Sequence, residues 1–139
     1  MSKIIVSNDT KELSKVIQFI SEKIDNHPHV VLKSKIQLEL AIEEAFVNVA
    51  NYAYDNESSE NYIKINITFE NQPLKAIVQI IDKGLKYNPL KSAEPNISLD
   101  ATDRPIGGLG IFLIKKNTDA ISYFYKNNEN VLTLEKVLE

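Results

Sequence analysis

The chain has 139 residues, the size of one ordinary domain, so we expect a single domain over residues 1–139 with one hydrophobic core. A hydrophobic share of 43% with 25% charged residues is typical of globular proteins and argues against intrinsic disorder. The formal net charge of −3 argues against a nucleic-acid binder, and the lack of cysteine excludes disulfides, thiolate metal sites and a cysteine nucleophile.

The N-terminal half predicts a strand and two helices. Lys3–Ser7 is a short β-branched run, and Asp9 then offers a capping side chain for a helix. Apolar residues recur at helical spacing over Leu13–Ile24, and Pro28 ends this helix because proline disfavours the helical conformation in the residue before it. From about Val31 to Tyr54 the apolar positions are dense enough to predict a long, deeply buried helix.

The C-terminal half predicts four strands, a loop and a helix. Tyr62–Phe69 and Leu74–Asp82 form a strand hairpin. The span Leu90–Ile106 has turn formers and little periodicity, so we expect a long loop, a feature that in compact domains is usually a lid or disordered. A helix then runs from a group of glycines to Lys116. The last two strands are Ala120–Lys126 and Val131–Val137.

This order of elements predicts an α/β (α+β) sandwich of two layers. The connections within the hairpins are short, so the sheet should be mixed but mostly antiparallel. The helices should cover one face of the sheet, because each has one apolar side to bury.

Glu44 and Asn48 place a carboxylate and a carboxamide four residues apart within the apolar stretch of the long helix, so both lie on one helix face. An amide oxygen is a hard, neutral ligand suited to Mg²⁺, which takes its other ligands from water and substrate phosphates. Glu44 would then be a candidate general base for a group that attacks a terminal phosphate. The same spacing is also common for a solvated pair of side chains.

Asp82 ends an apolar strand, and Gly84 follows two residues later. A carboxylate at this place can accept a hydrogen bond from an exocyclic amine, the group that distinguishes adenine from guanine. Gly84 would allow the backbone to pass close to the base. The alternative reading is an ordinary turn, because Asp-x-Gly is a frequent turn sequence.

The segment Gly107, Gly108, Leu109 and Gly110 contains three of the four glycines and stands directly before the third helical stretch. Backbone N–H groups and the positive end of the helix dipole favour an anion there, so this segment is a candidate phosphate cradle. An ordinary loop is the alternative. No Gly-Lys-Ser/Thr follows, so the segment is not a P-loop.

Together, these blocks resemble the GHKL ATPase superfamily, whose boxes read Glu-x-x-x-Asn, Asp-x-Gly-x-x-Phe/Tyr-Asn/Asp-Pro and Gly-x-Gly at the start of a helix. All three occur here in that order, between about Ile36 and Asp119. Chain length and the closing hairpin are similar to one branch, the anti-sigma factor serine/threonine kinases of bacterial stress and sporulation switches. The implied architecture is the Bergerat ATP-binding fold.

The resemblance implies ATP and Mg²⁺ as ligands and assigns roles to the matching positions. Asn48 would bind the metal and Glu44 would act as general base, with Asp82 and Gly84 as adenine contacts and Tyr87 packed near the base. Gly108, Leu109 and Gly110 would approach the phosphates, Gly107 would help the turn, and Leu90–Ile106 would be the ATP lid. Two departures are Tyr52, where many members carry histidine, and Lys86, where glycine or proline is common.

The resemblance also implies partners. The family phosphorylates a serine or threonine of a small STAS-type antagonist, or binds a sigma factor, and is usually homodimeric. No apolar run here is long enough for a signal peptide or a membrane span, so we expect a cytoplasmic protein without membrane contact. Two other functions stay open: a nucleotide-gated binding module without phosphotransfer, and a detached catalytic domain of a histidine kinase.

Overall fold

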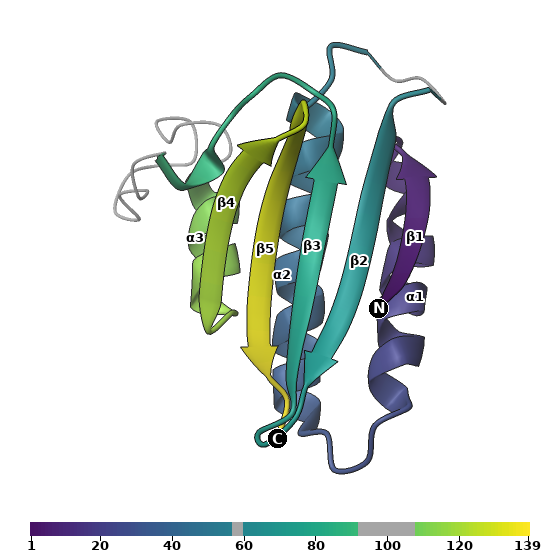
Figure 1. The fold of residues 1–139 in the computed structure, drawn as a ribbon, viewed down its shortest axis with the longest axis vertical. Helices are drawn as coiled ribbons and strands as arrows, with labels where there is room; N and C mark the ends of the chain where they lie inside the picture. The colour runs from purple at the N-terminus through teal and green to yellow at the C-terminus, as the bar shows by residue number, and fades with distance from the viewer. Residues whose placement is uncertain (57–59, 92–107) are drawn as a thin grey trace.

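The computed structural model describes residues 1–56, 60–91 and 108–139, which form an antiparallel sheet backed by helices (Figure 1). The strands are β1 (Ser2–Ser7), β2 (Tyr62–Glu70), β3 (Lys75–Asp82), β4 (Ala120–Lys126) and β5 (Glu129–Val137). The α-helices are α1 (Leu13–Asp25), α2 (Leu32–Tyr52) and α3 (Gly108–Lys116), and two short 3-10 helices are η1 (Thr10–Glu12) and η2 (Pro89–Lys91). The predicted two-layer α/β sandwich is confirmed.

The sheet has the order β1-β2-β3-β5-β4, and all four pairings among the described strands are antiparallel. The prediction of a mixed sheet, with some parallel pairing, was therefore wrong. The reason lies in the final hairpin. β4 follows a crossover from β3 that includes α3, but β5 turns back and inserts between β3 and β4, so it pairs with both of them in the antiparallel sense.

All three α-helices lie on one face of the sheet (Figure 1), because each has an apolar side that must be buried. α1 buries Val16, Ile20 and Ile24, one residue per turn. It follows η1, where the Asp9 side chain accepts a hydrogen bond from the Lys11 backbone N–H. α2 is the central helix, and its buried residues are Leu38, Ala41, Ile42, Ala45, Phe46 and Ala50.

The core lies between the sheet and the helices. Alternate residues of each inner strand point into it, among them Ile63, Ile65 and Ile67 of β2, which are at most 1% exposed. Burying one such side chain contributes about 1.5–3 kcal/mol relative to leaving it in water. This core fixes the position of α2 on the sheet, and so also the position of the polar residues that α2 carries.

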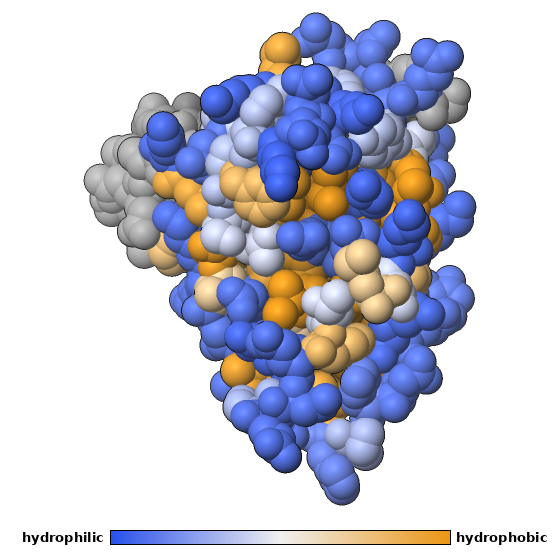
Figure 2. All heavy atoms as spheres, in the orientation of Figure 1, coloured by the Kyte–Doolittle hydropathy of each residue, from blue (hydrophilic) through white to orange (hydrophobic). Residues whose placement is uncertain are grey.

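The other face of the sheet is not covered by any described element, and Figure 2 shows it mostly hydrophilic with scattered apolar side chains. Ile5 of β1 and Phe124 of β4, which are 56% and 45% exposed, are the large apolar side chains at its two edges. None of the helices in the described part of the chain is long and apolar enough to cross a membrane.

Candidate active site

Two cavities lie on the helix side of the sheet and share Asn48 and Tyr52 of α2. The inner cavity is lined by Asn48, Val49, Tyr52, Ala53, Ile80, Asp82, Leu85, Tyr87, Pro89, Tyr123, Asn130 and Leu132. The outer cavity, of about 270 Å³, is lined by Glu44, Val47, Asn48, Asn51, Tyr52, Gly110 and Leu113. The fold thus brings residues from all three sequence blocks into one continuous site.

Glu44 and Asn48 both face the outer cavity from one side of α2, as their spacing predicts. Both are half-buried, and among the described residues neither side chain has a hydrogen-bond partner. A carboxylate and an amide that converge on a cavity without protein partners are available to a ligand.

The start of α3 lies against Glu44. A Cβ atom added to Gly110 would be 3.5 Å from Glu44 Oε2, an ordinary contact distance, so the helix backbone closes one side of the outer cavity. The first turn of α3 therefore lies next to the Glu44 carboxylate. Gly108 and Leu109 belong to this turn, whereas Gly107 and the expected lid beyond Lys91 lie outside the described residues.

Asp82 lies at the end of β3 with only 4% of its surface exposed. Its Oδ1 accepts hydrogen bonds from the Gly84 backbone N–H at 2.8 Å and from Asn130 Nδ2 at 2.9 Å. Burial raises the pKa of the carboxyl above its ordinary value, and the two hydrogen bonds oppose that rise. The result is an oriented carboxylate on the wall of the inner cavity.

Asn130 of β5 holds this region together, and the sequence interpretation did not include it. It is paired with Asp82 across the sheet and is 7% exposed. Its Nδ2 also donates to the carbonyl of Leu85 at 3.0 Å, and its Oδ1 accepts from the Tyr123 hydroxyl at 2.6 Å and from the Tyr87 backbone N–H at 3.2 Å. Asn130 thus fixes both the Asp82 side chain and the backbone that follows it.

Gly84 has a structural role that differs from the one expected. A Cβ at this position would lie 1.9 Å from the carbonyl oxygen of Ala53, which directly follows α2. That same carbonyl accepts a hydrogen bond from the Leu85 backbone N–H at 3.0 Å. The glycine is therefore required for close contact between the segment after β3 and the end of α2, whatever contact it also makes with a base.

Tyr52 and Tyr87 are the exposed aromatic side chains at the rim of the inner cavity, with 53% and 55% of their surfaces accessible. The cavity itself has a volume of about 40 Å³. Both rings are exposed enough to move when a flat ligand enters. Lys86 is not among the residues that line either cavity. Its ammonium lies 5.2 Å from the centre of the Tyr125 ring.

The described residues contain no group of three His, Asp or Glu side chains that could hold a metal ion by themselves. Asn48 fits Mg²⁺ in another way, as one hard oxygen ligand beside bound phosphates and water. The inner cavity, with aliphatic and aromatic walls and one oriented carboxylate, suits a flat heterocycle that carries an amino group. The outer cavity suits phosphates that are bound together with a cation, since the start of α3 lies beside the Asn48 amide.

Known proteins resemble this chain in sequence and in fold. The family model described as histidine kinase-like ATPase domain matches residues 6–136. The serine/threonine-protein kinase BtrW of Bordetella bronchiseptica is 25% identical over 132 residues, which cover 91% of each chain. The crystal structure of the RsbU and RsbW domains of Rv1364c from Mycobacterium tuberculosis has the same fold, with a TM-score of 0.68 and 11% identity. The present chain corresponds to 33% of that longer chain.

Proposed function

The chain belongs to the family of histidine kinase-like ATPase domains, and from this premise we propose that it is a serine/threonine protein kinase that uses Mg-ATP. The observation that carries the proposal is the pairing of Glu44 and Asn48 in the outer cavity, next to the start of α3. Neither side chain is used by the described part of the fold, and both are suited to phosphoryl transfer.

The inner cavity receives adenine in this proposal. The exocyclic amine of adenine donates a hydrogen bond to Asp82, whose orientation is set by Asn130 and Gly84. Guanine carries a carbonyl at the corresponding position, which would face a carboxylate acceptor without a hydrogen between them. The site should therefore bind ATP in preference to GTP.

The outer cavity holds the phosphates and the metal. Asn48 supplies an amide oxygen to Mg²⁺, and the first turn of α3, including Gly108, Leu109 and Gly110, presents backbone N–H groups to the phosphate oxygens. When bound, Mg²⁺ would neutralise charge on the phosphates, and Asn48 would hold it in place. Gly107 is expected to allow the turn into this helix.

Glu44 acts as the general base. It receives the proton of the acceptor hydroxyl as the hydroxyl oxygen forms a bond to the γ-phosphorus. The bond between the γ-phosphorus and the bridging oxygen breaks, and ADP leaves with the electron pair. The product is a phosphoserine or phosphothreonine, which survives acid treatment, unlike phosphohistidine.

The protein substrate is a small STAS-type antagonist in this proposal, and a sigma factor is a second partner. The resemblance of the whole chain to a named serine/threonine-protein kinase supports the reaction class. A homodimer and a location in the cytoplasm, without nucleic acid or membrane as a partner, complete the proposal.

Labelling with γ-labelled Mg-ATP in a protein extract of the source organism tests this function. The wild type should place acid-stable label on one small protein, and both Glu44→Gln and Asn48→Ala should abolish it. Asn48→Ala should also weaken Mg-ATP binding, whereas Glu44→Gln should leave it within about twofold of wild type. Intact ATP binding without any label would contradict the kinase and leave a nucleotide-gated binding module.

A further inference from the structure

A third hollow, the polar groove, lies beside the outer cavity and has no role in the proposed handling of ATP. It has a volume of about 210 Å³ and is lined by Asn8, Thr10, Ala50, Asn51, Tyr54, Asp55 and Asn56. Asn51 lines both the groove and the outer cavity, so the two hollows meet at this residue. A molecule bound in the groove could extend directly toward Glu44.

One row of polar side chains connects the two hollows. Glu44, Asn48 and Asn51 follow each other at steps of four and three residues on one face of α2, and Asp55 lies three residues after the end of this helix. Asn51 and Asp55 are exposed, and no described residue forms a hydrogen bond with either side chain. These amide and carboxylate groups are therefore open to a ligand along the whole row.

The chemistry of the groove favours a peptide. The Asn51 amide and the Thr10 hydroxyl are neutral groups that both donate and accept hydrogen bonds, as the N–H and C=O groups of a peptide backbone require. The amides of Asn8 and Asn56 already take part in hydrogen bonds of the fold. Among the described residues, the lining of the groove has no lysine or arginine and, unlike that of the outer cavity, no start of an α-helix, so it does not suit a phosphate. Asp55 is the charged side chain among the described residues of the lining, and it favours a positively charged residue on the ligand.

We propose that the polar groove binds the segment of the acceptor protein that carries the phosphorylated serine or threonine. This inference rests on the proposed kinase function and adds the recognition of the acceptor. The segment lies extended along α2, with its hydroxyl at Glu44 and a lysine or arginine at Asp55. The eight helical steps from Glu44 to the end of α2 rise about 12 Å, which equals about four residues of extended chain, and Asp55 lies beyond that end, so the basic residue should lie about four or more positions from the hydroxyl.

The test uses synthetic peptides that contain one serine and either one lysine or one glutamate, at one to seven positions on either side. Transfer of acid-stable label from γ-labelled Mg-ATP is measured at equal peptide concentration. With the wild-type chain, lysine about four or more positions away should give roughly tenfold faster labelling than glutamate there. Asp55→Lys should reverse this preference, because it inverts the charge in the groove, and Thr10→Val should slow all peptides.

Glu43→Lys is the matched control, since Glu43 is an exposed carboxylate on α2 that lines neither cavity nor the groove. It should keep the wild-type preference, and all variants should bind Mg-ATP within about twofold of wild type. If peptides are not labelled but the protein in the extract is, the same variants are assayed on that protein, and only Asp55→Lys and Thr10→Val should slow its labelling.

Two outcomes overturn the inference and can be told apart. Labelling that is insensitive to Asp55→Lys and Thr10→Val would place the acceptor elsewhere and leave the kinase function intact. No labelling of any peptide or protein by the wild type, with Mg-ATP binding intact, would refute the kinase function and the acceptor groove together.

Discussion

Asp82 is a buried carboxylate that two hydrogen bonds hold in place. Among the described residues it forms no ion pair with a lysine or arginine. Because burial raises its pKa above the ordinary value, the folded state favours the protonated form. Its contribution to stability is therefore fully present at acidic pH and is lost as the pH rises through the raised pKa. At neutral pH the charged side chain is less favourable for folding than a neutral one of the same shape.

Asp82→Asn should consequently stabilise the protein at pH 7 while it weakens ATP binding. The asparagine oxygen can accept the same hydrogen bonds from Gly84 and Asn130, so the melting temperature should rise by about 3 °C. Mg-ATP affinity should fall by at least about tenfold. Calorimetric scans at pH 7 and at about pH 3 check the sign, because the difference should vanish where both side chains are neutral. A lower melting temperature at pH 7 would contradict this account.

Gly84 and Gly110 should respond differently to the same substitution. Gly84→Ala places a methyl group 1.9 Å from the Ala53 carbonyl oxygen, so backbone must move and unfolding should become easier by about 1–3 kcal/mol. Gly110→Ala meets only Glu44 Oε2, at 3.5 Å, and should leave stability nearly unchanged. Urea unfolding of the two variants measures both effects. Equal stability of both would show that the contact with α2 is not needed.

Asn130→Ala removes the side chain that joins Asp82, Leu85, Tyr87 and Tyr123. Each polar group left buried without a partner costs about 1–3 kcal/mol, and the loss of orientation at Asp82 should weaken Mg-ATP binding by about tenfold. Thr133→Ala is the control, because it alters the same strand on the opposite face of the sheet. Titration calorimetry measures both variants, and equal ATP affinities would refute a positioning role for Asn130.

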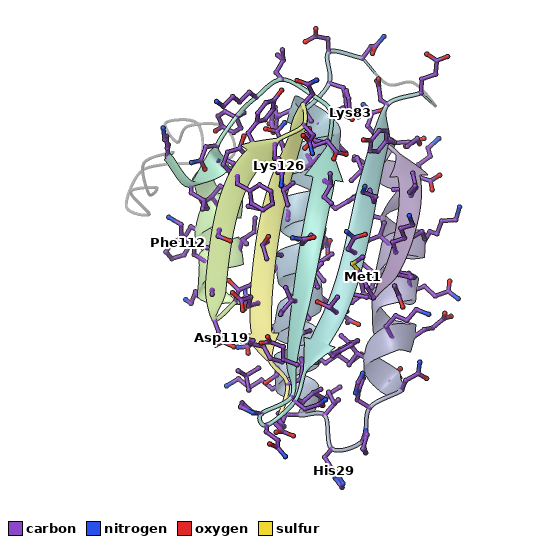
Figure 3. The ribbon with its side chains drawn as sticks, viewed as in Figure 1. Met1, His29, Lys83, Phe112, Asp119 and Lys126 are labelled. Carbon is purple, nitrogen blue, oxygen red and sulfur yellow. The ribbon has the colours of Figure 1, made fainter. Side chains whose placement is uncertain are left out.

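Tyr54 lies two residues after α2 and connects the end of this helix to the sheet by hydrogen bonds. Its hydroxyl donates to the carbonyl of Tyr62 in β2 at 2.6 Å and accepts from the backbone N–H of Lys83, just after β3, at 2.8 Å. Burial raises the pKa of the phenol, so it stays protonated and keeps its donor at neutral pH. Figure 3 shows Lys83 at the end of the sheet that also carries Lys126, opposite the end marked by Asp119.

Tyr54→Phe should therefore loosen the contact between α2 and the strands. It removes a half-buried hydroxyl that both donates and accepts a hydrogen bond, so the free energy of unfolding should fall by about 1–2 kcal/mol. Tyr52→Phe is the matched control, because Tyr52 is half exposed and its hydroxyl makes no hydrogen bond within the described residues. Urea unfolding compares the two. A loss of stability as large in Tyr52→Phe would contradict the role of this clamp.

The elements with strong periodicity were predictable from sequence. The apolar pattern of α1, the density of apolar residues in α2 and the β-branched runs of β2 and β3 each lead to the observed element within a few residues. The start of β5 was placed two residues too late, because the asparagines of the turn were read as a longer loop. The structure turns at Asn127 and Asn128 alone, both with positive φ, and Asn130 already belongs to the strand.

The site as a whole depends on how α2, α3, β3 and β5 assemble (Figure 1), and the sequence indicates only part of this. Glu44 with Asn48 follows from helical spacing, and Asn51 could have been found by extending the same row. Asn130 could not have been found in this way, because its place opposite Asp82, 48 residues earlier in the chain, depends on the register between β3 and β5. The need for glycine at position 84 could not be predicted either, because it depends on how closely the segment after β3 approaches the end of α2.

Titration of the intact chain with Mg-ATP and with Mg-GTP is the measurement that tests the central claim most directly. We predict saturable binding of ATP with one site per chain, and binding of GTP weaker by at least about tenfold, because Asp82 accepts from an amine that guanine lacks at that position. Equal affinity for the two nucleotides would refute the role of Asp82 in recognising the base. No binding of ATP would refute the nucleotide site itself.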